Sequence, residues 1–385
     1  MSLVTLNFNA IRLGHPLPFP LRGANGMLLA QKGYVIPSRE DLDHLIARGM
    51  QLCVDTDEVG PDQTVYLSRQ RGLRSTPVPE AGGREAGPPD WIELQIRATQ
   101  LLRAPQVAGF GQRFEHLHDE LARHVRRAPD AALLALIYLS ADETRMYSAT
   151  HALLVSAACM LTARDVLRWS DEEVGLVGRA ALSMNVGMTA LQDTLARQVT
   201  PLRSEQVEQI GTHRDRSGEL LREAGIDHPV WLEAVQHHHL REPGRLADRT
   251  PARRMARLIQ RADLFAARIA PRVSRPPMAV TAAMQASYFD EDNRMDEAGA
   301  ALVKALGIYV PGSFVRLASN EVGIVTRRGA SGTTPRVAVL LNRQGLPVAE
   351  TTQRDTSHVM FKVVGHLTAR EAKVQWPLDK VLALA

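Results

Sequence analysis

The spacing of apolar residues predicts that most of this chain is helical. Between residues 91 and 307, apolar side chains recur every three or four positions. Two such stripes are Leu133, Leu134, Ile137 and Tyr138, and Leu153, Leu154, Ala157, Ala158 and Leu161. This period places the side chains on one face of a helix, so we predict a core made of helix after helix.

The pattern is different near the N-terminus, where short apolar runs alternate with turn residues. Asn25-Gly26 favours a hairpin turn, since both residues accept positive φ. Residues 39–48 carry apolar side chains at helical spacing. The predicted strands are residues 27–30, 34–36 and 52–54. Residues 1–60 therefore predict a small α+β domain.

The pattern changes again after residue 309, where β-branched and apolar residues dominate. The predicted strands here are residues 314–317, 322–326 and 337–341. Residues 77–89 are rich in Pro and Gly and cannot bury an apolar face, so they predict a linker. We therefore predict a mainly α fold with four parts. These are an α+β domain at 1–60, a linker at 61–90, a helical domain at 91–308 and a β-rich module at 309–385.

Composition narrows the class of protein further. The net charge of +4 over 385 residues is too small to predict DNA binding. The two cysteines, Cys53 and Cys159, are far apart in sequence, which favours a reducing compartment. The chain has no signal-peptide pattern and no apolar run approaching the roughly 20 residues that span a bilayer. We expect a cytoplasmic protein without membrane insertion.

Histidine and aspartate residues in the helical part are the candidates for chemistry. They are His151, His213, His237, His238, His239 and Asp263. His and Asp side chains on several helices of one bundle are how helical domains build metal sites. The alternative is that these residues are hydrogen-bonded core groups. Successive helical side chains turn by about 100°, so at most two of the three consecutive histidines can serve one site.

The order of these motifs resembles the HD-GYP family, from about Asp130 to the end of the chain. The matching segments are His151, residues 180–188, Asp193, residues 201–206, His213 with Ser217-Gly218, residues 236–238, Asp263 and Arg275-Pro276. The resemblance implies an HD-type helical bundle. Members of this family hydrolyse cyclic di-GMP with bound metal ions, and the family's Asp bridges two or three of those ions. The resemblance implies the same kind of site here.

The chain departs from the family at the residues that hold those metals. Met184 stands in place of the hallmark His, Asn185 in place of the Asp, and Met188 in place of the following Lys. Tyr147 replaces an acid, His239 replaces a Glu, and the Gly-Tyr-Pro that names the family is absent. Asn185 offers one neutral oxygen and Met184 a soft thioether, so neither could hold paired hard cations. The sequence therefore predicts that this chain lacks an intact set of catalytic residues.

Three functions stay open from the sequence. The first is an inactive HD-GYP-like regulatory protein that binds cyclic di-GMP or a signalling protein. The second is a metal-dependent phosphodiesterase with a rearranged mononuclear site. The third is an interaction scaffold without a small ligand. A second copy of the chain is a further candidate partner.

The cofactor prediction has two alternatives. Either no cofactor is held, or a single Fe, Mn or Zn ion is bound by remnant ligands from the set His151, His213, His237, His238 and Asp263. Arg275, together with His237 and His238, is the candidate for contacting a phosphate, since a guanidinium suits phosphate geometry. The alternative is that Arg275 is an ordinary surface residue in a proline-rich turn.

Overall fold

The computed structural model describes residues 3–5, 14–17, 19–23, 27–38, 41–42, 52–55 and 89–384, except 143, 145, 243, 330, 374, 375 and 377. The chain divides into two compact units, Met1–Ala86 and Gly87–Ala385. The predicted Asn25-Gly26 turn, all but residues 41–42 of the helix predicted at 39–48, and residues 61–88 of the linker predicted at 61–90 lie outside the described residues.

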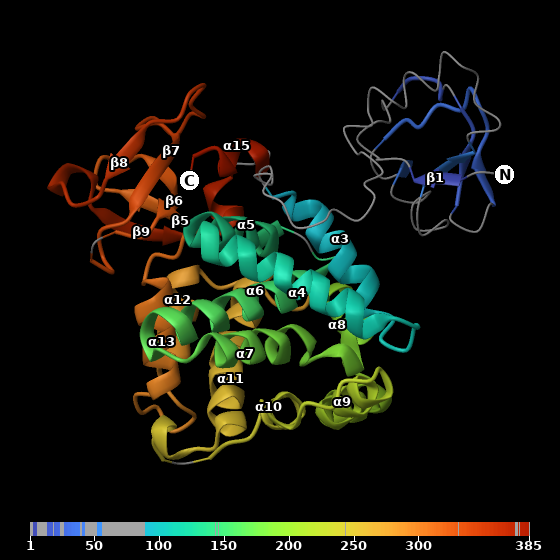
Figure 1. Ribbon diagram of the computed structural model, residues 1–385. Coiled ribbons are helices and arrows are strands. Elements are labelled where there is room, and N and C mark those ends of the chain that lie inside the picture. Colours follow the sequence, from blue (N-terminus) through green and yellow to red (C-terminus); the bar gives the residue numbers. More distant parts are fainter. Residues whose placement is uncertain are drawn as a thin grey trace, which may run out of the picture. The chain divides into compact units, whose positions relative to one another are not determined.

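The first unit contains a four-stranded antiparallel sheet in the order β1-β4-β2-β3. Its strands are β1 (Leu3–Thr5), β2 (Leu21–Arg22), β3 (Leu28–Ala30) and β4 (Cys53–Asp55), seen in Figure 1. The strand predicted at residues 34–36 contributes one isolated bridge, between Pro16 and Val35. Phe19, Leu21 and Ile36 are almost fully buried, as expected for a small apolar core.

The second unit begins with a bundle of helices (Figure 1). They are α3 (Trp91–Leu102), α4 (Phe110–Arg127), α5 (Pro129–Asp142), α6 (Tyr147–Thr162), α7 (Asp171–Ser183), α8 (Thr189–Arg197), α9 (Ser204–Glu223), α10 (Pro229–His237), α11 (Pro251–Ile269), α12 (Val280–Tyr288) and α13 (Glu297–Leu306). Shorter helical segments lie between some of them: the π-helix η3 (Ala163–Leu167) and the 3-10 helices η4 (Val186–Met188) and η5 (Leu246–Asp248).

Helix α6 is the centre of this bundle. Every one of its residues is buried, and helices α3, α4, α5, α7, α8, α11 and α13 all contact it. A helix that is apolar all round, rather than along one stripe, has to be enclosed in this way. By length and composition alone, Tyr147–Leu167 and Asp171–Arg197 could cross a membrane. However, 78% and 61% of their apolar windows are buried inside the protein, as in core helices.

Polar residues decide where the neighbouring helices begin. Ser170 and Glu173 form a capping box at the start of α7, in which each side chain accepts a hydrogen bond from the other residue's backbone N–H. Thr250 caps α11, and Pro251 occupies its first position, where no N–H is needed. These caps set the start points of two helices that carry or flank the candidate residues.

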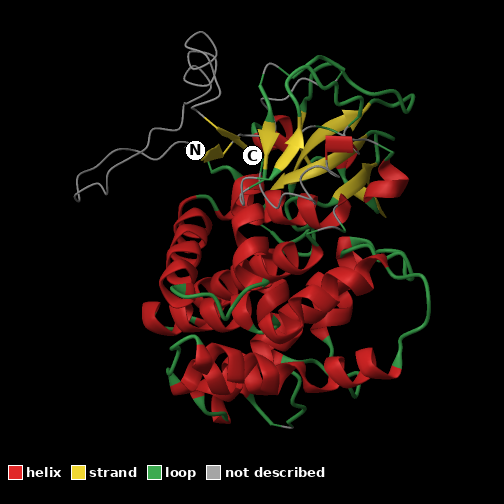
Figure 2. Ribbon diagram, turned by 90° about the vertical axis from the view of Figure 1, so that its right-hand side faces the viewer, coloured by secondary structure: helices red, strands yellow, loops and turns green. Residues whose placement is uncertain are grey.

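The C-terminal part is a five-stranded antiparallel sheet in the order β8-β7-β6-β5-β9. Its elements are β5 (Phe314–Leu317), β6 (Val322–Arg327), β7 (Arg336–Leu341), β8 (Gln353–Asp355), η6 (Val359–Phe361), β9 (Val363–Leu367), α14 (Ala369–Ala372) and α15 (Leu378–Leu382). The sheet lies on one side of the helical layer (Figure 2). The predicted mainly α class is confirmed. The exact boundaries of the four predicted parts remain predictions.

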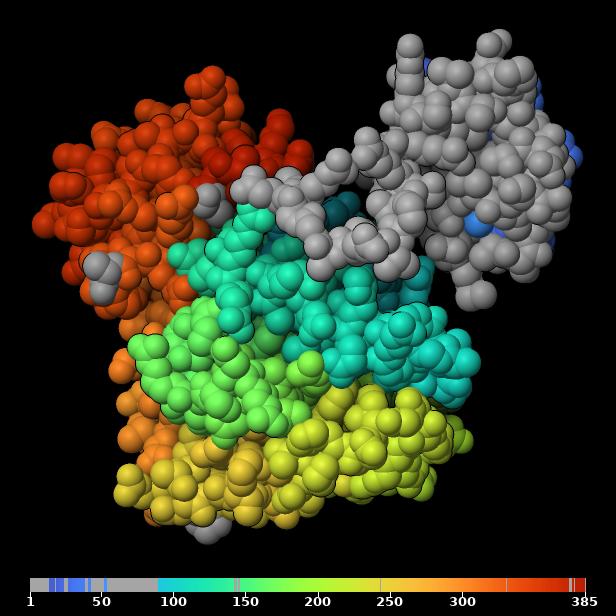
Figure 3. Space-filling view, in the orientation of Figure 1, coloured from blue at the N-terminus to red at the C-terminus, as the bar shows by residue number. Residues whose placement is uncertain are grey.

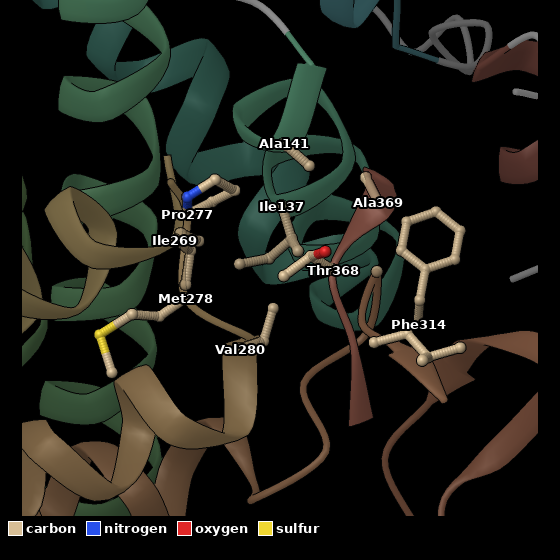
Figure 4. A pocket seen from close by; sticks show the side chains of 11 residues that line it. Ile137, Ala141, Ile269, Pro277, Met278, Val280, Phe314, Thr368 and Ala369 are labelled. Atoms are coloured by element: carbon tan, nitrogen blue, oxygen red, sulfur yellow. The ribbon is translucent and has the colours of Figure 1, made fainter. Parts of the chain in front are cut away.

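The C-terminal part lies beside the helical part in one compact unit (Figure 3), and its sheet packs closely on α5. Gly312 has φ +97°, and an added Cβ would lie 2.7 Å from Cβ of Ile137, so only glycine permits the approach. The Tyr138 hydroxyl donates to the Trp376 carbonyl at 2.6 Å and accepts from its N–H at 3.1 Å. Figure 4 shows a cavity at this junction, lined mainly by apolar side chains such as Ile137 and Phe314. Its volume of about 20 Å³ is that of a packing defect rather than a ligand site.

His118 on α4 is a buried titratable group in the bundle, 2% exposed. Its Nε2 has no hydrogen-bond partner in the described part of the chain and lies so close to Gly178 that an added Cβ there would be 2.7 Å from it. Burial, helped by the charge of Arg179, lowers the pKa of His118 to about 4, although Asp119 opposes this. The folded protein therefore holds His118 neutral at a pH where an unfolded chain would protonate it.

We predict that the stability of the protein falls as pH is lowered from 6.5 to about 4, in part because of His118. In that window the unfolded chain binds a proton that the folded protein excludes. The shift corresponds to about 3 kcal/mol at most. Urea unfolding followed by circular dichroism at several pH values measures it. The His118→Leu variant should show a flatter pH dependence, and an unchanged slope would contradict the prediction.

Candidate functional site

The candidate site is centred on two histidines that face each other from different elements. His213 lies in α9, and His238 follows the last residue of α10. The Nδ1 of His213 is 2.6 Å from the Ile210 carbonyl, and the Nδ1 of His238 is 2.6 Å from the Val235 carbonyl. A carbonyl oxygen can only accept, so each Nδ1 carries the proton. Both Nε2 atoms are therefore left as bare acceptors.

These two bare nitrogens are only 3.3 Å apart. Two lone pairs at this distance repel each other unless a cation lies between them. Two nitrogen ligands bound at about 2.0–2.1 Å in tetrahedral geometry are themselves about 3.3–3.4 Å apart. The separation of the two Nε2 atoms therefore fits a shared metal ion.

His239 completes a group of three. One ring nitrogen from each of His213, His238 and His239 lies within 4.8 Å of the others. His213 and His238 are buried, whereas His239 is exposed and its ring centroid lies 5.2 Å from that of His213. Three protein ligands with one side open to solvent is the arrangement of catalytic rather than structural zinc sites.

The protonation state of this group also suits metal binding. Burial is the main cause that lowers the pKa of each of the three histidines, and it lowers that of His238 to about 3. The neighbouring His239 lowers the pKa of His213 and His238 further. All three are consequently neutral near pH 7, the state in which imidazole binds a metal.

A carboxylate lies close to the three histidines. Asp263 of α11 accepts a hydrogen bond at 2.7 Å from Nε2 of His151 in α6. Burial raises the pKa of Asp263, but the His151 hydrogen bond and the nearby histidines outweigh it and lower the pKa overall. Asp263 is thus ionised and favours a cation in the three-histidine group. The Nδ1 of His151 is buried without a hydrogen-bond partner in the described structure.

The neutral phenol of Tyr147 lies at the first turn of α6, in contact with the positive charge of Arg272. The Tyr147 ring stacks on His151 with centroids 5.8 Å apart. Arg272 donates to the Tyr147 hydroxyl at 2.8 Å, and its guanidinium lies 5.1 Å from the ring centroid. Burial raises the pKa of Tyr147, so the phenol stays neutral. Tyr147 therefore offers no anionic ligand.

Asp193, one of the family-matching residues, positions α6 rather than the histidine group. Its carboxylate accepts from the Ser148 N–H at 2.8 Å, at the positive end of that helix. The other carboxylate oxygen accepts from Arg103 at 2.5 and 3.0 Å. These contacts hold the first turn of α6 and, through it, His151.

Met184, Asn185 and Met188 are three of the positions that depart from the family pattern, and they lie at the end of α7 and in η4. Met184 is fully buried in the apolar core. Asn185 is 7% exposed, and its Oδ1 has no hydrogen-bond partner among the described residues. Met188 is half-buried. Met184 thus acts as a core residue, and Asn185 holds an unsatisfied buried oxygen.

Two further candidates lie apart from the three-histidine group. The Nδ1 of His237 is 2.8 Å from the Glu233 carbonyl, within its own helix. Arg275 is exposed in a tight turn and donates to the Ala267 carbonyl at 2.5 Å. His239 was not among the predicted ligands. The helical spacing argument could not select it, because α10 ends at His237 and the next two residues leave the helix.

Comparison with known proteins supports the resemblance inferred from the motif order. The chain is 26% identical, over an alignment of 279 residues, to cyclic di-GMP phosphodiesterase PA4108 of Pseudomonas aeruginosa. The match covers 67% of this chain and 66% of that protein, slightly less than two thirds of its length. The chain thus resembles this family of proteins, as predicted.

A solved structure is also similar: Bd1817, an HDG"Y"P protein from Bdellovibrio bacteriovorus. The TM-score is 0.47 at 13% identity, covering 79% of this chain and 99% of that one. No protein-family model matches the chain.

We predict that the purified protein binds one Zn(II) or Co(II) ion through the three-histidine group. The His213→Ala and His238→Ala variants should weaken binding by about a hundredfold or more, since losing even an outer-shell partner costs about 10–100-fold. Calorimetry and the visible spectrum of bound Co(II) measure this. His237→Ala is the matched control and should bind as the wild type does. Unchanged binding in the His213→Ala and His238→Ala variants would place the metal elsewhere.

A second prediction concerns Gly187 in η4, which packs directly on α9. A Cβ there would lie 2.7 Å from the His213 carbonyl oxygen and 2.8 Å from the Ser217 nitrogen. These are backbone atoms, so Gly187→Ala should displace α9 and destabilise the protein by about 1–3 kcal/mol. It should also weaken metal binding.

The matched control for Gly187 is Gly211, on the same helix α9, where an added Cβ meets nothing within 4 Å. Gly211→Ala should leave metal affinity unchanged and raise stability by up to about 1 kcal/mol. Thermal unfolding and metal titration of both variants make the comparison. Equal behaviour of the two variants would refute the packing argument.

Proposed function

We propose that this chain is an HD-GYP-like regulatory protein that binds cyclic di-GMP without hydrolysing it. The relative in Pseudomonas aeruginosa supports cyclic di-GMP as the ligand. The burial of Met184 in the apolar core is the observation that carries the loss of hydrolysis, because no ligand projects from that position. The proposal places the protein in the cytoplasm, with neither DNA binding nor membrane insertion.

The electrostatics of the site support this proposal. Paired divalent ions repel each other and need bridging carboxylates to remain close. Asp263 is ionised, but Asn185 supplies a neutral amide and Tyr147 a neutral phenol. The Arg272 guanidinium on Tyr147 adds a positive charge. One metal ion suits this balance of charge better than two.

The three-histidine group supports a second candidate function, a mononuclear metal-dependent phosphodiesterase. His213, His238 and His239 would hold the ion and leave one position open. A metal ion in such a site supplies an activated water at neutral pH. Asp263 and His151 would then orient and stabilise the histidine side of the site.

In either case, we assign to Arg275 the binding of the phosphates of cyclic di-GMP. It is exposed, and one hydrogen bond to the Ala267 carbonyl holds its guanidinium against the end of α11. A guanidinium held in this way can still bind phosphate oxygens with its free edge. Other signalling proteins and a second copy of the chain are further proposed partners.

We predict that calorimetric titration with cyclic di-GMP, in the presence of Mn(II), shows binding and that the recovered nucleotide is intact. Arg275→Gln should weaken binding about tenfold, the effect of losing roughly one charged hydrogen bond. Arg126→Gln, which changes an exposed arginine on α4, is the control. Rapid cleavage of the nucleotide would favour the mononuclear enzyme, and absence of binding would favour a scaffold without a small ligand.

The Asn185→Asp variant makes this test sharper. It restores a carboxylate at a buried position whose oxygen has no hydrogen-bond partner among the residues that the structure describes. If the missing charge is what prevents hydrolysis, this variant should bind Mn(II) more tightly than the wild type. An unchanged affinity would mean that Met184 and Tyr147, rather than Asn185, limit the site.

A further inference from the structure

A cleft of about 520 Å³ lies where the helical bundle meets the C-terminal sheet. It is bordered by the start of α5, the end of α13 and the connection between β6 and β7. The residues that matter for its chemistry are Asp130, Lys304, Tyr309, Arg328, Ser331 and Gly332. None of the histidines discussed above lines it. Its volume falls within the range of about 300–1,000 Å³ typical of small-molecule sites.

The guanidinium of Arg328 is held in one orientation at this cleft. Its Nε donates to Oδ1 of Asp130 at 2.5 Å, and its Nη1 donates to the Ala305 carbonyl at 2.6 Å. Its Nη2 makes no hydrogen bond within the described part of the chain. A fixed guanidinium loses little entropy when it binds an anion, which is the advantage of arginine at phosphate sites.

Lys304 gives the cleft an excess of positive charge. Its side chain is exposed, and the described residues include no acidic partner for it. Asp130 offsets the charge of Arg328, and Lys304 remains uncompensated. A lysine ammonium is a strong point donor to phosphate oxygens.

The β6–β7 connection adds neutral donors to the lining of the cleft. An added Cβ at Gly329 would lie 1.8 Å from the Thr334 carbonyl, so glycine is required for the loop to fold back. This fold brings Oγ of Ser331 within 2.7 Å of the Thr334 hydroxyl and 3.2 Å of the Thr333 hydroxyl. The Cβ position of Gly332 has nothing within 4 Å, so a ligand can approach the backbone there.

Tyr309 supplies an aromatic wall. Its ring lies against His366 of β9, with centroids 5.5 Å apart. Burial raises the pKa of Tyr309, so its hydroxyl is a neutral donor at pH 7. An aromatic wall beside cationic and hydroxyl donors matches a ligand with a ring at one end and an anion at the other.

We infer that this cleft binds a nucleoside monophosphate, with the phosphate between Arg328, Lys304 and the Ser331 hydroxyl and the base beside Tyr309. The inference does not depend on the proposed function of the histidine site, because the two sites share no residue. It assigns the junction between bundle and sheet a role in small-molecule binding.

Calorimetry with GMP, guanosine and inorganic phosphate as separate probes tests this in low-salt chloride buffer. GMP should bind and guanosine should not. Lys304→Met should lower the affinity for GMP about tenfold, equivalent to about 1.4 kcal/mol, and Ser331→Asp should abolish binding through charge repulsion. Lys380→Met, at an exposed lysine of α15, is the control and should bind normally.

Each outcome decides between the alternatives. Phosphate binding as tight as GMP would keep the anion site but remove the role of Tyr309. Absence of binding by both phosphate and GMP would overturn the inference, as would GMP affinity that is insensitive to Lys304→Met and Ser331→Asp. A His213→Ala variant should bind GMP normally. Loss of GMP binding in that variant would instead place the nucleotide at the histidine site.

Discussion

Helix α6 has no side that faces solvent, and the rest of the second unit follows from this constraint. Seven other helices pack around it, so its apolar residues are enclosed in all directions. It also carries His151, which is buried with it. A buried histidine needs a polar partner, and Asp263 of α11 provides one at 2.7 Å. Enclosing the helix thus brings the histidine and the carboxylate together.

The same enclosure sets the electrostatic character of the site. Burial keeps the three histidines neutral, and the nearby carboxylate of Asp263 remains ionised. The Arg272 guanidinium adds an opposing charge at Tyr147. Such a site favours one cation with nitrogen ligands over a pair of cations bridged by oxygen. This balance of charge connects the replaced residues to the proposed loss of hydrolysis.

Close backbone approaches hold the two ends of the second unit in place. Gly187 lets η4 lie directly on α9, and Gly312 lets the C-terminal sheet lie on α5. Both contacts are tight enough that a single methyl group would disturb them. The Gly187 contact supports the three-histidine group. The Gly312 contact supports the junction between bundle and sheet, where the cleft around Lys304 and Arg328 lies.

The sequence by itself determined the helical core, the C-terminal strands and the resemblance to the HD-GYP family, because apolar spacing and motif order are local properties. It also identified Met184 and Asn185 as the altered positions. Only the tertiary structure showed that His239, and not His237, joins His213 and His238. That choice depends on where α10 ends and how α9 packs on η4, and neither is encoded in the spacing of three identical residues. The cleft around Lys304 and Arg328 likewise required the fold, because its residues come from segments separated by more than 170 positions in the chain, from Asp130 to Lys304 and beyond.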